Sequence, residues 1–248
     1  MDATRIIREA LARVAHLRHL QACSPELAAH VKIIKAFQAR RFKGTYADLL
    51  QSGSYQEAAQ FFLDELYSDK DYTERDAQFE RIAGTLQTLF PKQVISTAVS
   101  LAHLHTVTEE LDHAMALAWQ GALPFPSTAS DCTCYVTAWR AVGHRAEREL
   151  QLQVVQEIGV ELARLTRLPG LRLMLKMMRR PAHAAGLASL QTFLESGFDT
   201  FAGMSRQPRG VEVFLSIVQE RESALIRLLF DASPVAGETE LVRTLGKV

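Results

Sequence analysis

The hydrophobic residues of this chain recur at steps of three and four positions along most of its length. This spacing gathers apolar side chains on one face of a helix and predicts amphipathic helices that bury that face. Prolines, glycines and polar runs interrupt the pattern and divide it into about eight segments. No stretch alternates apolar and polar residues for long enough to predict a strand. The sequence therefore predicts an all-α fold of about eight helices in a single compact, bundle-like unit.

The strongest interruption lies at residues 121–130, which contain two of the prolines and a glycine. If the single domain is subdivided, we expect the boundary here, between residues 1–120 and residues 131–230. The last part of the chain again contains helix-breaking residue types, at Pro234 and Gly237, and has little apolar content. We therefore expect a mobile tail at residues 231–248.

Two helix starts carry clear capping signals. Ser24 is followed by Pro25, which are residue types favoured at the N-cap and at the first helical position. Ser54 is followed by Glu57 three residues later, which is the spacing of a capping box and predicts a helix that starts near Tyr55.

Charged and aromatic residues gather where that helix gives way to the next, which we expect to start at Thr73. Side chains of these types can hold a corner by hydrogen bonds and by an ion pair of the arginine. We interpret the group as a structural corner network, with a ligand site as the alternative. Its members are Asp64, Glu65, Tyr72, Arg75 and Asp76.

The same stretch carries a resemblance. The run FFLDELY followed by RDAQF is similar to the signature of a family of uncharacterised bacterial helical proteins, and the later runs PGLRLMLKMMRRPA and LQTFLESGFDTF are similar to the second half of that family. The resemblance covers residues 54–230. It implies a helical fold, and it implies no activity, ligand or catalytic residue.

Composition narrows the class of protein only slightly. Lysine plus arginine equals aspartate plus glutamate at 28 each, so the net charge gives no reason to expect a nucleic acid partner. The N-terminus lacks the apolar core of a signal peptide, and no run approaches the 18 or so apolar residues of a membrane span. The three cysteines suggest no disulfide framework. We therefore expect a soluble cytoplasmic protein.

Zero net charge conceals a segregation of charges along the chain. Between residues 57 and 80 eight acidic residues stand against two basic ones, whereas residues 164–180 contain six basic residues and no acidic one. On the helix expected at residues 171–180 the basic side chains line one side and the apolar side chains the other. This arrangement suits an acidic protein partner, a second copy of the chain or, with less support, an anionic membrane surface. The candidate interaction residues are Arg172, Lys176, Arg179 and Arg180. The alternative is that the two segments meet within one chain or are simply solvated.

A second basic cluster ends the second expected helix. We assign it to favourable interaction with the negative C-terminal end of that helix, in preference to a binding patch. It comprises Lys32, Lys35, Arg40, Arg41 and Lys43.

Metal and haem sites are the enzyme-class alternatives. His105, Glu109 and His113 follow one another at four-residue steps and form a ridge on one helix, where imidazole and carboxylate can bind a divalent metal. A solvated ridge is the simpler interpretation, because helical di-iron sites use ligands from four helices. For haem, the sequence contains no Cys-x-x-Cys-His motif for covalent attachment.

Cys132 and Cys134 lie near a helix start, where thiol pKa values tend to fall, although two buried thiols are the simpler expectation.

Nucleophile and phosphate-loop motifs are missing from the sequence. We therefore expect no catalytic residue and no cofactor. The function that the sequence favours is a non-enzymatic binding or interaction protein that self-associates. The alternative is a metal- or haem-binding helical protein with redox or hydrolytic activity.

Overall fold

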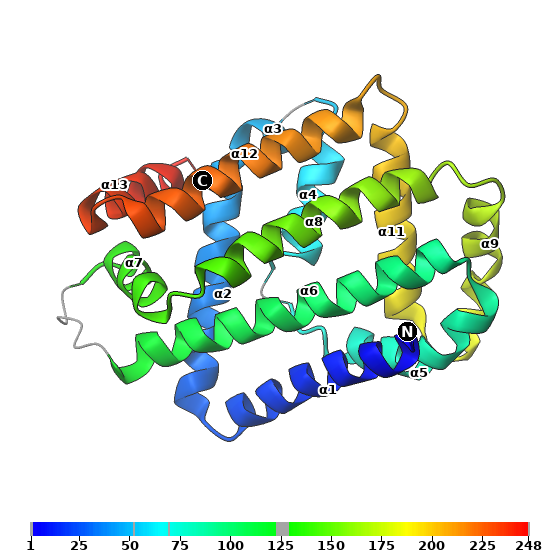
Figure 1. The fold of residues 1–248 in the computed structure, drawn as a ribbon, viewed down its shortest axis with the longest axis horizontal. Coiled ribbons are helices and arrows are strands. Elements are labelled where there is room, and N and C mark those ends of the chain that lie inside the picture. The colour runs from blue at the N-terminus through cyan, green and yellow to red at the C-terminus, as the bar shows by residue number, and fades with distance from the viewer. Residues whose placement is uncertain (1, 52, 69, 123–128, 248) are drawn as a thin grey trace. The chain divides into compact units, whose positions relative to one another are not determined.

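The computed structural model of the chain describes residues 2–51, 53–68, 70–122 and 129–247 (Figure 1). The prediction of an all-α fold is confirmed, because every regular element of these residues is a helix. The elements are α1 (Ala3–Ala22), α2 (Pro25–Thr45), α3 (Ala47–Gln51), α4 (Gln56–Glu65), α5 (Thr73–Leu89), α6 (Lys92–Leu117), the π-helical turn η1 (Ala118–Ala122), α7 (Asp131–Val142), α8 (Arg145–Leu165), α9 (Leu171–Met177), α10 (Arg179–Ala184), α11 (Ala188–Met204), α12 (Gly210–Asp231) and α13 (Pro234–Leu245).

The described residues form more helices than the eight or so that the pattern predicts. Turns at Tyr46, at Gly143 and at Met178 divide segments whose apolar spacing continues across them. A helix can end while the apolar spacing persists, because the spacing fixes which face is buried and the backbone at the turn fixes where the helix stops.

The helices begin within one residue of the predicted positions, but not every N-cap is the predicted residue. Ser24 caps α2 as expected, and its hydroxyl accepts a hydrogen bond from the Leu27 N–H at 3.3 Å. The N-cap of α4 is Tyr55 rather than Ser54, because the turn at Gly53, whose φ is 86°, carries the chain one residue further before the helix begins.

At the start of α5 the capping group is Asp71, two residues before the helix. Its carboxylate accepts hydrogen bonds from the N–H of Thr73 at 2.9 Å and from the Thr73 hydroxyl at 2.6 Å.

Contacts divide the chain into two compact units, and neither is a continuous stretch of sequence. The first comprises residues 1–15, 70–106 and 154–216, and the second comprises residues 16–69, 107–153 and 217–248. The segment 121–130, where we expect any subdivision of the domain, falls largely outside the described residues, at 123–128.

The core of the first unit includes two clusters of buried hydrophobic side chains. α1, α5 and α6 meet through Ile7, Ala83 and Ala102, which have exposed fractions of 0–1%. A second cluster joins α8, α9 and α11, and its buried members are Leu165, Leu171, Leu175 and Phe198. This second cluster fixes the face that α9 turns toward the protein.

The core of the second unit contains a group of contacting aromatic rings. The rings of Phe37 and Tyr135 stack with centroids 4.3 Å apart, and Phe42 contacts both Tyr46 at 4.3 Å and Tyr67 at 4.5 Å. Residues from α2 and α7 are therefore held together by ring contacts, each of which adds about 0.5–1.5 kcal/mol beyond the area it buries.

The expectation of a mobile tail is wrong. Residues 234–245 form α13, which packs against α2 and α7 (Figure 1). Leu241 is 1% exposed, and an added Cβ at Gly44 of α2 would lie 2.0 Å from the carbonyl oxygen of Thr244. The two helices approach this closely because Gly44 has no side chain, and the buried apolar face then holds α13 in place.

Candidate functional site

The basic helices α9 and α10 bury one face and expose the other. Leu171 and Leu175 are each 8% exposed, and Ala182 is 5% exposed. These positions recur at four- and seven-residue steps, so they form one buried stripe, as the apolar spacing predicts. The four predicted interaction residues lie outside the stripe and are exposed, and they are Arg172, Lys176, Arg179 and Arg180.

Two of the four arginine and lysine side chains already have partners within the first unit. Arg172 forms an ion pair with Asp199 at 2.9 Å, and the Nε of Arg179 lies 2.7 Å from Glu195. The hydrogen bond from Arg179 holds the pKa of Glu195 below its ordinary value. Both carboxylates belong to α11. From the sequence, residues 57–80 are the acidic segment that could meet the basic segment 164–180. The ion pairs of Arg172 and Arg179 are instead made with α11.

Lys176 and Arg180 form no ion pair with any residue that the structure describes. Beside them, Leu173 is 62% exposed and Met177 is 70% exposed. The four residues follow the spacing i, i+3, i+4 and i+7, which is one face of a helical segment. We refer to Leu173, Lys176, Met177 and Arg180 as the α9–α10 surface, which combines exposed apolar side chains with cations that have no ion pair in the described ranges.

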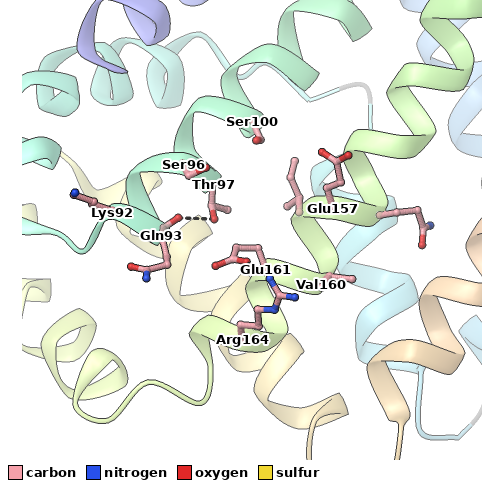
Figure 2. A pocket seen from close by; sticks show the side chains of 11 residues that line it. Lys92, Gln93, Ser96, Thr97, Ser100, Glu157, Val160, Glu161 and Arg164 are labelled. Atoms are coloured by element: carbon pink, nitrogen blue, oxygen red, sulfur yellow. Dashed lines mark hydrogen bonds and ion pairs between the residues drawn. The ribbon is translucent and has the colours of Figure 1, made fainter. Parts of the chain in front are cut away.

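A groove of about 620 Å³ lies between α6 and α8 in the same unit (Figure 2). Figure 2 shows hydroxyl side chains such as Ser96 and Ser100 on the α6 side and charged side chains such as Glu157 on the α8 side. On the α8 side Arg164 pairs with Glu161, one turn away on the same helix, at 3.2 Å. The lining offers donors, acceptors and charges of both signs, so no single ligand chemistry follows from it.

The predicted metal ridge on α6 is divided among other partners. The Nε2 of His105 lies 2.7 Å from Asp76, and the buried Glu109 accepts a hydrogen bond from Lys35 at 2.6 Å. His113 is half-buried one turn further along. Within the part of the chain that the structure describes, no group of three His, Cys, Asp or Glu side chains is placed to hold a metal ion.

Two members of the predicted corner network, Tyr72 and Arg75, are in contact. The guanidinium of Arg75 lies 3.9 Å from the ring centroid of Tyr72 and 4.6 Å from that of Phe193, so aromatic rings flank the arginine. Asp76 turns to His105 on α6. Asp64, which accepts a hydrogen bond from Gln60 at 2.9 Å, and Glu65 belong to α4 in the second unit.

The thiols of Cys132 and Cys134 are buried in α7. Burial raises the pKa of both thiols, and the nearby carboxylate of Asp131 raises them further. Since the thiolate is the nucleophilic form, this environment opposes nucleophilic chemistry at either cysteine.

The second unit contains a buried ionic cluster that the sequence did not reveal. Arg41 and Glu222 are 6% and 7% exposed, and their side chains meet at 2.6 Å. The hydroxyl of Tyr46 donates to the same carboxylate at 2.9 Å. Burial lowers the pKa of Arg41. The charge of Glu222, with smaller contributions from nearby tyrosines, raises the pKa by more, so the pKa of Arg41 lies above its ordinary value.

Three of the five residues of the basic cluster of α2, which we assigned to the end of the helix, have specific acidic partners. Lys35 pairs with Glu109, Arg40 with Asp131 at 3.2 Å, and Arg41 with Glu222. Arg41 and Glu222 stand 181 residues apart in the chain. No local spacing connects residues so distant, so the pairing depends on the tertiary fold.

The model of one family, described as "Domain of unknown function (DUF8198)", matches residues 17–236. No curated protein matches the chain, and no solved structure matches it. No helix of the described residues has both the length and the apolar content that crossing a bilayer requires. The matched residues make up most of the sequence and include both stretches on which the resemblance rests. The chain belongs to the family of the domain of unknown function DUF8198.

Proposed function

We propose that this chain is a non-enzymatic interaction protein that binds an acidic surface on a second copy of itself through the α9–α10 surface. The observation that carries the proposal is the combination of two exposed apolar side chains, Leu173 and Met177, with two cations that have no ion pair among the described residues, Lys176 and Arg180.

The apolar pair supplies the attraction. Fully burying a leucine or methionine side chain contributes about 1.5–3 kcal/mol. Leu173 and Met177 are already buried by about a third, so covering the rest contributes roughly 1–2 kcal/mol for each side chain. Contacts of this size are large enough to affect affinity, because about 1.4 kcal/mol changes a dissociation constant tenfold.

The cations supply the choice of partner. Charge complementarity favours acidic surfaces and disfavours basic ones, and each copy of the chain exposes acidic side chains between residues 57 and 80, among them Glu57, Glu74 and Glu80. An anionic membrane is the less suitable occupant, because Asp199 and Glu195, which pair with the neighbouring Arg172 and Arg179, would be brought toward lipid phosphates of like charge.

Sedimentation velocity of surface variants tests the proposal. Replacing Lys176 and Arg180 by glutamate should weaken self-association about 30-fold at low salt, since each lost contact is worth about 1 kcal/mol. The matched control replaces Lys32 and Arg206 by glutamate in the same way. These are two exposed cations elsewhere that form no ion pair among the described residues. It should associate as the wild type does.

Three outcomes contradict the proposal. The first is a wild type that stays monomeric, and the second is a charge-reversed variant that associates like the control. The third is the finding that wild-type protein floats with vesicles of anionic lipid but does not self-associate, which would assign the α9–α10 surface to a membrane.

A further inference from the structure

Arg148 is a charged residue of the second unit whose side chain is buried. It lies in the first half of α8 and is only 6% exposed. Its guanidinium lies 4.1 Å from the ring centroid of Trp139 on α7, which is a close cation–π contact. Burial lowers the pKa of Arg148, which shows that its surroundings oppose the charge more than they support it.

One edge of this guanidinium has no acceptor among the residues that the structure describes. The Nε and Nη2 atoms of Arg148 are buried and have no hydrogen-bond partner in the described part of the chain. The N–H groups of Nε and one Nη point the same way and match the two oxygens of a carboxylate or phosphate group. The indole Nε1 of Trp139 is also buried, and no described residue accepts a hydrogen bond from it. Three donor atoms around this pair of side chains therefore have no acceptor in the described ranges.

The acidic side chain whose charge acts on Arg148 does not fill this role. Asp112 is 3% exposed, and its carboxylate already accepts a hydrogen bond from Gln38 at 2.9 Å. Its charge acts on Arg148 only as a secondary influence, after burial and Tyr135. A buried cation without a bonded counterion is strongly unfavourable, so buried charges in proteins are normally paired.

We propose that Arg148 and Trp139 form the recognition edge of an internal oxyanion site, which takes the carboxylate or phosphate group of a small ligand. Two oxygens of the group receive the Nε–H and Nη2–H of Arg148, and the indole N–H of Trp139 donates to the same group. The site consists of donors, and donors on a cation select an oxyanion over a neutral or cationic ligand. The site belongs to the second unit, whereas the α9–α10 surface belongs to the first.

The test uses Trp139 as its own reporter. The chain has two tryptophans, so Trp119→Phe leaves Trp139 as the single indole. Sodium phosphate, sodium acetate and sodium chloride are titrated into this variant at constant ionic strength, while the emission of Trp139 and the melting temperature are followed. Phosphate or acetate should give a saturable change in emission and a rise in melting temperature that grows with the logarithm of concentration. The phosphate and acetate arms distinguish the two sources of the oxyanion, and chloride should have neither effect.

Arg148→Lys, made in the same background, keeps the charge and removes the two-donor edge, so the saturable change should disappear while the helical circular dichroism is retained. Arg145→Lys is the matched control, because Arg145 lies on the same helix and pairs at the surface with Asp231. It should respond as the parent does. If Arg148→Lys does not fold, Trp139→Phe keeps the stacked ring, and loss of one donor should weaken the phosphate- or acetate-dependent stabilisation about fivefold to tenfold.

The proposal is overturned if the folded parent shows no saturable response to phosphate or acetate, in which case ordered water satisfies the three donors. It is also overturned if Arg148→Lys responds like Arg145→Lys.

Discussion

Replacing Glu222 by glutamine removes one charge from the centre of the second unit and little else. Glutamine has nearly the shape of glutamate and keeps an oxygen that accepts the Tyr46 hydroxyl, now 2.9 Å from the carboxylate. Arg41 then remains 6% exposed with its charge and without a counterion. Removing one partner of a buried ion pair costs about 3–5 kcal/mol, and the retained acceptor places this variant near the lower end, at about 3 kcal/mol.

The size of this loss distinguishes a buried pair from an exposed one. Arg221 and Asp48 lie next to the cluster in the same unit and meet at 2.7 Å, but their side chains are 30% and 59% exposed. Solvent screens such a pair, so Asp48→Asn should cost about 0–1 kcal/mol. The two variants change a carboxylate to an amide in the same way, and Asp48→Asn therefore serves as the matched control.

Urea unfolding followed by tryptophan fluorescence measures both variants in the relevant part of the protein. Trp119 and Trp139, which are the two tryptophans of the chain, both lie in the second unit. A third variant, Arg41→Met with Glu222→Gln, removes the stranded charge and should recover more than about 1 kcal/mol relative to the sum of the two single changes. The reasoning is refuted if Glu222→Gln costs no more than Asp48→Asn, or if the two changes at the buried pair are additive.

Further predictions concern a buried carboxyl, the thiols and a glycine. Burial raises the pKa of Asp112 from its ordinary value of 3.8, so the folded protein binds this proton more tightly than the unfolded chain does, and stability falls as pH rises through that interval. Asp112→Asn should therefore be more stable than the wild type at neutral pH and lose that advantage below pH 3.8, as urea unfolding at both pH values would show. In the folded protein a thiol reagent should modify the exposed Cys23 rapidly and the two buried thiols of α7 only on unfolding, and rapid reaction of all three would contradict the burial. Gly44→Ala should cost about 1–3 kcal/mol by thermal melting because its Cβ meets the carbonyl of Thr244, whereas the roomier Gly84→Ala should be neutral or stabilising by up to about 1 kcal/mol.

Helices and their buried faces follow from local spacing, and that part of the fold was predictable. Leu171 and Leu175 are buried because they recur on one face of α9, and α2 begins after Ser24 because serine and proline suit that position. The helix α13 was missed although it carries the same signal. Ser233 precedes a proline and accepts a hydrogen bond from the Ala236 N–H at 3.3 Å. The apolar pattern after Ser233 is too short to predict a helix, and contacts with α2 and α7 stabilise α13.

Charged residues were harder to assign because their partners come from distant parts of the chain. The spacing of the basic residues on α9 and α10 was sufficient to place them outside the buried face. It could not show that α11 supplies Glu195 and Asp199 as their partners. Arg148 and Glu222 carry no sequence signal at all, because a charged residue on a helix is solvated in most proteins and only the tertiary fold buries it.

The central claim, self-association through the α9–α10 surface, is tested most directly by sedimentation equilibrium of the wild-type chain over a range of concentrations at low and high salt. Exposed charges are screened over about 8 Å at physiological ionic strength. The account predicts a mass above that of the 27.7 kDa monomer at low salt, rising with concentration and falling toward the monomer as salt is added. A monomeric mass at every concentration and salt, or an association that salt leaves unchanged, would contradict it.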